Sequence, residues 1–185
     1  YIDWTPFFHT WELKGSFPSI LEHPVLGEQA RSLLHDAENM LDGWIEHGSV
    51  QAHALCGLFP ANAKGDDLLI YTDESRSQVL TTLCFHRQQL SGVSNRSLCL
   101  SDFVAPTSST TPDWVGAFCV TAGDGLAEIV ASYEEQLDDY NAILSKALAD
   151  RLAEASAERL HKQVRKELWG YAPNEKIDNN ELIKE

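Results

Sequence analysis

The chain has 185 residues, of which 43% are hydrophobic and 23% charged, and its formal net charge is -14. A chain of this length forms one domain, or at most two small ones, and can bury a core without disulfides or metals. The negative charge argues against nonspecific binding to nucleic acid and to anionic membrane surfaces. No run of 18 apolar residues occurs in the sequence, so it predicts no membrane span.

The cysteines indicate the compartment. Cys56, Cys84, Cys99 and Cys119 are widely separated and form no CxxC pair, so the sequence indicates no zinc site. Three of them stand in apolar runs typical of strands, which predicts buried free thiols in a reducing compartment, and hence a cytoplasmic protein. The chain starts without Met or a signal peptide on an aromatic-rich stretch, which favours a fragment of a longer polypeptide or a processed chain.

The first stretch, residues 1–17, is rich in aromatic residues but too irregular to predict a clean helix or strand. We expect an ordered arm that is buried against the core. Asp3 stands out in this arm because Ile2 and Trp4 flank it. It can serve as a turn or N-cap residue before Pro6, or as an acid that an aromatic pocket presents to a cationic ligand group.

The middle of the chain changes from helical to strand periodicity. Residues 24–48 combine an apolar face with a mostly acidic one and predict an amphipathic helix. Apolar runs separated by turn residues follow and predict an antiparallel meander. The expected strands are 52–59, 68–72, 78–85 and 114–123, of which 78–85 can alternatively start a helix. A short extended piece is expected at 99–104, with loops at 60–67, 88–95 and 107–113.

Residues 138–171 give the longest uninterrupted helix signal, and a shorter helix is predicted at 124–137. Acidic residues lie near the start of the long helix and basic residues near its end, in keeping with the helix dipole. Gly170 is predicted as its C-cap and Pro173 as its stop. Strands in the middle with helices at both ends predict an α+β fold, a single domain with an antiparallel sheet and flanking helices.

The sequence contains no dinucleotide-binding, phosphate-loop or nucleophile-elbow motif. On the long helix, Asp150, Glu154, Glu158 and His161 share one face. Glu158 and His161 have the spacing of carboxylate-bridged metal sites, but such sites need ligands from a second helix, so we favour a solvated face. Residue types alone therefore predict a soluble α+β domain that is part of something larger.

Several stretches together resemble one known family. In chain order they are YIDWTPFF (1–8), GLFPAN (57–62), DD (66–67) with YTDESR (71–76), RQQ (87–89), LCLSDFVAP (98–106), DDYN (138–141), KALADRLAE (146–154) and HKQVRKELWGYAPNE (161–175). The combination resembles the activation domain of cobalamin-dependent methionine synthase, and the resemblance covers residues 1–185. It implies a single α+β domain with a twisted antiparallel sheet.

The resemblance also implies a function. Methionine synthase, a methyltransferase of methionine biosynthesis, moves a methyl group from methyltetrahydrofolate to homocysteine by way of cobalamin, and this cofactor is sometimes oxidised. The activation domain then binds S-adenosylmethionine, whose methyl group restores methylcobalamin together with an electron from a flavodoxin-type donor. A neighbouring cobalamin-binding domain holds the cobalamin, and zinc belongs to the homocysteine module; neither module is in this chain.

Three acids match functional residues of the family. Asp3 matches the aspartate of its IDW motif, which implies a charge-assisted hydrogen bond to the amino group of S-adenosylmethionine. Glu154, within ADRLAE, matches an acid that lines the same ligand site. Asp150 matches an acid at the interface with the cobalamin-binding domain.

One part of the family pattern is missing. The RPxxGYP segment that completes the family's ligand site is expected shortly after the position of Glu185 and is not in this chain. We therefore expect the N-terminal portion of an activation domain, with weakened ligand affinity, exposed core surface and no turnover on its own. The alternative is a non-catalytic docking module or remnant that binds a cobalamin protein or a flavodoxin-type partner without S-adenosylmethionine.

Overall fold

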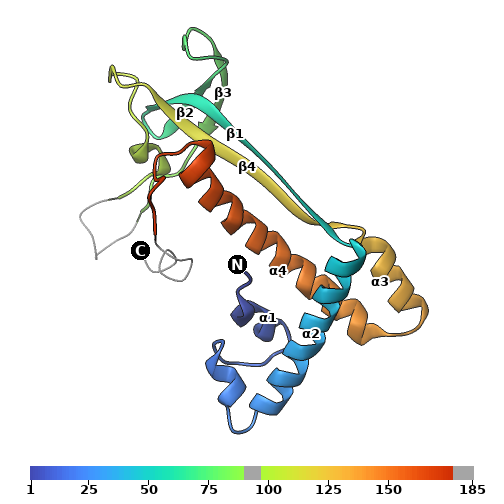
Figure 1. Cartoon of the computed structure of the whole chain (residues 1–185). Helices are drawn as coiled ribbons and strands as arrows, with labels where there is room; N and C mark the ends of the chain where they lie inside the picture. The colour runs from blue at the N-terminus through green and yellow to red at the C-terminus, as the bar shows by residue number, and fades with distance from the viewer. Residues whose placement is uncertain (90–96, 177–185) are drawn as a thin grey trace. The chain divides into compact units, whose positions relative to one another are not determined.

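The computed structural model describes residues 1–89 and 97–176 (Figure 1). Its helices and strands, in chain order, are α1 (Trp4–Thr10), the 3-10 helix η1 (Ser19–Glu22), α2 (Gly27–His47), β1 (Gln51–Lys64), β2 (Asp67–Tyr71), β3 (Val79–Cys84), the 3-10 helix η2 (Leu100–Phe103), β4 (Asp113–Asp124), α3 (Leu126–Glu135), α4 (Asp139–Gln163) and the π-helical turn η3 (Val164–Leu168). The expected α+β class is confirmed. The chain divides into two compact units, residues 1–55 with 119–185, and residues 56–118.

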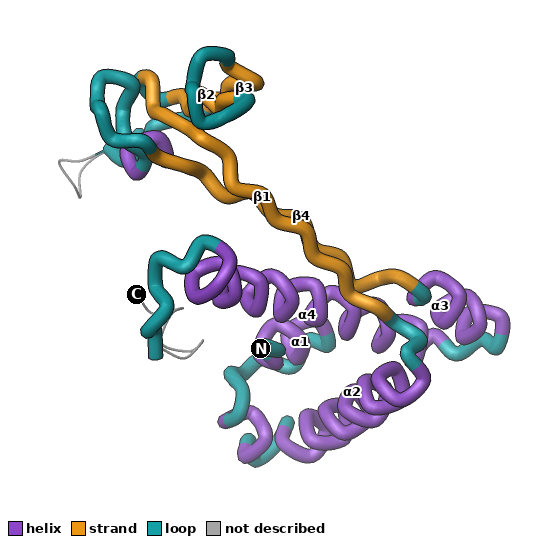
Figure 2. The backbone as a smooth tube through the Cα atoms, turned by 45° about the horizontal axis from the view of Figure 1, so that its top comes forward, coloured by secondary structure: helices purple, strands orange, loops and turns teal. Residues whose placement is uncertain are grey.

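The four strands form one sheet in the order β3-β2-β1-β4. β1 pairs with β2 and β2 with β3, both antiparallel, so the predicted meander is confirmed. Gly65, with φ +64, turns the chain between β1 and β2. His53 near the start of β1 bonds Asp124 at the end of β4 at 3.2 Å, so these two strands also run antiparallel (Figure 2).

The first unit has a core of helix side chains. Phe7 and Phe8 of α1 are fully buried and belong to one cluster with Leu144 and Leu148 of α4. Each such side chain contributes about 1.5–3 kcal/mol through burial. The other buried members of the cluster are Leu13, Ile20, Ala30, Leu33, Ala37 and Trp44.

The expectation that residues 1–17 contain no clean helix is wrong, because α1 occupies Trp4–Thr10. A seven-residue helix has too little intrinsic stability to show a clear sequence pattern, and its packing in the core stabilises it. Pro6 fits in its first turn, where backbone N–H groups have no partner within the helix.

The second unit, residues 56–118, has a small apolar cluster, and two arginines link its segments through hydrogen bonds. The guanidinium of Arg76 donates hydrogen bonds to the backbone oxygen of Ala61 at 2.9 Å and to that of Asp113 at 2.7 Å. The same group lies over the rings of Tyr71 and Trp114, at 5.6 and 5.3 Å from their centroids. Arg76 therefore joins three segments of this unit through hydrogen bonds and cation–π contacts.

Arg87 makes the second cross-link of this unit. It donates to Asp66 at 2.7 Å and, through both terminal nitrogens, to the two carboxylate oxygens of Asp102 at 2.7 and 2.8 Å. Asp102 also accepts the backbone N–H of Cys99 at 2.9 Å and so closes the first turn of η2. The piece expected to be extended at 99–104 is therefore a 3-10 helix over most of its length, because a local side-chain cap favours the turn.

Two further expectations need correction. The loop expected at 60–67 is confirmed only at residues 65 and 66, because β1 continues to Lys64 and β2 begins at Asp67. All four cysteines are free, but Cys84 and Cys119 are exposed and only Cys99 is buried, so the prediction of buried thiols fails. An apolar strand is buried only where another layer covers it, and β3 is exposed along its whole length. Of the loop expected at 88–95, residues 90–95 lie outside the described residues.

The long helix ends nearly as predicted. α4 begins after its N-cap Asp138, and the π-helical turn η3 carries the helical path to Leu168. Gly170 then adopts φ +75, and its N–H bonds the backbone oxygen of Val164 at 3.2 Å, which confirms it as the terminating glycine. None of the helices within residues 1–89 and 97–176 has the length and apolar character that a membrane crossing requires.

The Arg87–Asp102 pair predicts a pH effect. Two hydrogen-bond donors lower the pKa of Asp102 from 3.8 to about 2. The Arg87 guanidinium has the larger effect and the Cys99 N–H the smaller one. A carboxyl group with a lowered pKa stabilises the fold above its ordinary pKa and loses that contribution as the pH falls through its folded value. We expect an NMR titration to give a midpoint near pH 2 for Asp102 and a higher midpoint in Arg87→Gln, still below the ordinary value because the Cys99 N–H remains. Arg159→Gln on α4 is the control, and an ordinary midpoint in the unsubstituted protein would contradict the prediction.

Candidate functional site

Asp3 caps helix α1 with one oxygen of its carboxylate. Oδ1 accepts the backbone N–H of Thr5 at 2.9 Å, so the predicted N-cap role is confirmed. Asp3 is exposed, and Oδ2 makes no hydrogen bond within the described part of the chain. The cap uses one oxygen and leaves the other accessible, so the N-cap interpretation and the ligand interpretation of Asp3 are compatible.

The N-terminal arm lies along α4. Near the middle of α4, Leu144 and Leu148 share the buried cluster with Phe7 and Phe8. Near its end, the ammonium of Lys162 lies 5.7 Å from the centroid of the Tyr1 ring. Figure 1 shows α1 and the N-terminus beside this helix. The arm, with Asp3 two residues from Tyr1, is therefore positioned by the core at one end and by a cation–π contact at the other.

Glu154 and Asp150 are brought together through a shared arginine. Arg151 donates to Glu154 and, at 2.6 Å, to Asp150. The Arg151 side chain is only 11% exposed, whereas those of Asp150 and Glu154 are 73% and 62% exposed. Exposed ion pairs contribute little to stability, but this trio carries a net charge of minus one on the surface of α4. The face expected to be solvated does carry exposed acids at these two positions.

Asp3 stands on a different element from these two acids, but in the same unit. Lys162, which contacts Tyr1, follows His161 of the acidic face by one residue, or roughly 100° around the helix. The contact between Tyr1 and Lys162 therefore lies about 80° around α4 and about 12 Å along it from Glu154. Within residues 1–89 and 97–176, no group of three or more His, Cys, Asp or Glu side chains is arranged to hold a metal ion.

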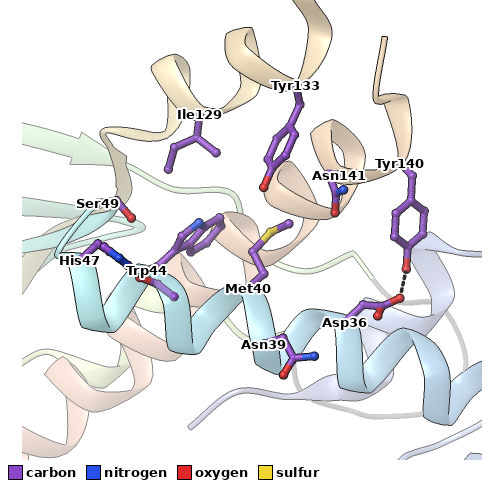
Figure 3. A pocket seen from close by; sticks show the side chains of 11 residues that line it. Asp36, Asn39, Met40, Trp44, His47, Ser49, Ile129, Tyr133, Tyr140 and Asn141 are labelled. Atoms are coloured by element: carbon purple, nitrogen blue, oxygen red, sulfur yellow. Dashed lines mark hydrogen bonds between the residues drawn. The ribbon is translucent and has the colours of Figure 1, made fainter. Parts of the chain in front are cut away.

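A pocket that sequence reasoning did not identify lies elsewhere in this unit. Its volume is about 610 Å³, and none of Asp3, Asp150 and Glu154 lines it. Its walls come from α2, α3 and the start of α4 (Figure 3). The helical spacing of the α2 residues resembles an ordinary core face, so the pattern alone could not reveal a cavity. The lining residues are Asp36, Asn39, Met40, Gly43, Trp44, His47, Ser49, Ile129, Tyr133, Tyr140 and Asn141.

The comparison with protein families decides what the chain is. A family model described as the activation domain of vitamin B12-dependent methionine synthase matches residues 1–185. The chain belongs to this family. The resemblance drawn from short sequence stretches is thereby confirmed.

A solved structure, "Crystal Structure of the MetH Reactivation Domain bound to AdoHcy", is 50% identical to this activation domain and superposes with a TM-score of 0.94. The match covers 100% of this chain and 57% of that one, so the activation domain described here spans a little over half of the relative's length. The fold class agrees with that relative. The roles assigned to Asp3, Glu154 and Asp150 stay predictions.

The cap geometry separates two functions of Asp3. Asn caps helices as well as Asp, whereas Ala cannot accept the Thr5 N–H. We expect Asp3→Ala to lower the free energy of unfolding by about 1 kcal/mol and Asp3→Asn to leave it nearly unchanged. Urea denaturation followed by circular dichroism measures both. Equal losses in the two variants would show that the charge of Asp3, rather than its cap, stabilises the fold.

Proposed function

We propose that this activation domain supplies part of an S-adenosylmethionine site for the reductive reactivation of B12-dependent methionine synthase. The observation that supports this most directly is Oδ2 of Asp3, which has no hydrogen-bond partner among the described residues and stands on an arm that packs along α4. Further support comes from the relative at 50% identity, whose structure holds AdoHcy. Asp3 and Glu154 are the residues we propose for contacts with the ligand.

The residues present fit such a ligand. S-adenosylmethionine carries a protonated amino group and a positively charged sulfonium, and both are favoured near carboxylates. Asp3 offers one oxygen without a partner in the described part of the chain, and the Asp150–Arg151–Glu154 trio adds a net negative charge. Bound S-adenosylmethionine would supply the methyl group for the cobalamin.

In this proposal each side chain has one task. Asp3 orients the ligand through its ammonium group, and Glu154 adds negative charge beside it. Arg151 holds Glu154 and Asp150 in fixed positions through its two hydrogen bonds. Asp150, the most exposed of the three, faces the partner surface, which we propose is the cobalamin-binding domain of the same enzyme. A flavodoxin-type protein would deliver the electron, and the parent enzyme would be cytoplasmic.

The alternative function is a docking module that binds a cobalamin protein or a flavodoxin-type partner without S-adenosylmethionine. The chain spans only 57% of the relative, so residues that complete a ligand site can lie outside it, and this favours the alternative. In either case we propose that the 185-residue chain does not turn over alone, because the modules that hold cobalamin and homocysteine are not in it.

Calorimetric titration of S-adenosylmethionine into the 185-residue chain tests the proposal. We expect saturable binding that Asp3→Asn weakens by about 1–3 kcal/mol, the scale for hydrogen bonds to charged groups, without lowering stability. Glu154→Gln should weaken binding less, because Arg151 already neutralises part of its charge. Asp42→Asn on the exposed side of α2 is the matched control and should bind normally.

Two results would change the conclusion. A folded chain that gives no heat of binding would favour the docking module. Binding that is unaffected by Asp3→Asn would remove Asp3 from the site, even if the ligand binds.

A further inference from the structure

The pocket lies between α2, α3 and α4, and Figure 3 shows the side chains that line it. On α2, its lining runs along one stripe from Asp36 to His47. Tyr133 of α3 points into the space across from this stripe, and Tyr140 of α4 closes the end near Asp36. A volume of about 610 Å³ lies in the range of sites that hold small organic molecules, roughly 300–1,000 Å³.

Gly43 lines this pocket on the α2 side, and its missing side chain leaves space there. It lies well inside the 21-residue helix α2, where glycine is less favourable than alanine. A Cβ built at Gly43 meets nothing within 4 Å, so no neighbouring atom requires a glycine at this position. Its main structural effect is therefore the space above it, between the side chains of Met40 and Trp44.

The lining combines three aromatic side chains with one carboxylate and several polar groups, His47 among them. Trp44, Tyr133 and Tyr140 contribute aromatic rings and Asp36 contributes a carboxylate, and among the described residues no Lys or Arg lines the pocket. Tyr140 donates a hydrogen bond to Asp36 Oδ2 at 2.7 Å, and the Tyr140 ring packs on Trp11 at 5.2 Å between centroids. These contacts fix the position of the carboxylate.

Asp36 keeps capacity for a second partner. The pKa of Tyr140 is raised to about 12, mainly by burial and secondly by the hydrogen bond to Asp36. The phenol therefore stays neutral and remains a hydrogen-bond donor. Asp36 Oδ1 makes no hydrogen bond within the described part of the chain. A carboxylate beside aromatic faces is an arrangement that attracts organic cations.

We propose that this pocket binds a small organic cation, namely a flat ring body that carries a protonated amine. The ring lies over Gly43 against Trp44 and Tyr133, and the ammonium binds Oδ1 of Asp36. The net charge of -14 favours the approach of such a cation. The site is separate from the Asp3 arm and does not depend on the proposed function.

Tryptamine is the probe, and indole-3-propionate, which has a similar ring but the opposite charge, is the matched control ligand. NMR of the 15N-labelled 185-residue chain follows the indole N–H of Trp44. We expect a saturable shift with tryptamine and an affinity at least roughly tenfold lower for the anion. Asp36→Asn should weaken tryptamine binding by roughly tenfold, because the charge is lost while an acceptor for Tyr140 remains.

Gly43→Leu separates binding from folding. Leucine is a better helix former than glycine and projects into the open space, so binding should disappear while the midpoint of urea unfolding stays equal or rises. Gly43→Ala, with a smaller side chain, keeps the test valid if leucine disturbs the helix. No shift of Trp44, equal affinity for the two ligands, or full affinity in a folded Gly43→Leu variant would overturn the proposal.

The variants also separate this pocket from the arm. Asp3→Asn should bind tryptamine normally, and Gly43→Leu should bind S-adenosylmethionine as the unsubstituted chain does. Loss of S-adenosylmethionine binding in Gly43→Leu but not in Asp3→Asn would place that ligand in the pocket. That result would support the pocket and refute the assignment of the ligand to the Asp3 arm.

Discussion

The packing of α1 on α4 is the contact on which the candidate site depends. Phe7 and Phe8, both fully buried, join the cluster that contains Leu144 and Leu148. A helix of seven residues does not form stably in water, so this burial gives α1 its structure. With α1 in place, the backbone of Thr5 is fixed, and its N–H holds the carboxylate of Asp3. A substitution in the aromatic core would therefore disturb the site although it touches no ligand.

Much of the fold could be predicted because its signals are local. The long helix has apolar residues at helical spacing, and the strands of the meander alternate with turn residues. The short helix α1 and the exposed faces of β3 could not be predicted, because both depend on which other layers are present. The acids at 3, 150 and 154 came from resemblance, whereas their hydrogen bonds came only from the structure. The 610 Å³ pocket could not be predicted at all, because Asp36 and Tyr140 are 104 residues apart in sequence.

Acidic residues of this chain differ in how many of their carboxylate oxygens already accept hydrogen bonds from the protein. This difference distinguishes structural acids from candidate binding acids. Both oxygens of Asp102 are occupied by Arg87, and Oδ2 also accepts a backbone N–H, which lowers its pKa to about 2. Such a carboxylate has little capacity left for a ligand. Asp3 and Asp36 each give one oxygen to the protein, to a backbone N–H and to a tyrosine hydroxyl respectively.

Asp3 and Asp36 are held in the same way. In each, a single hydrogen bond fixes the direction of the carboxylate, and no arginine or lysine neutralises it in the described part of the chain. A carboxylate that is oriented but not neutralised loses less side-chain conformational entropy when it binds a cation, because its rotamer is already fixed. Glu154 differs, since Arg151 shares its charge. Among these acids, Asp3 and Asp36 should therefore contribute most to the binding of cationic ligands, each at its own site.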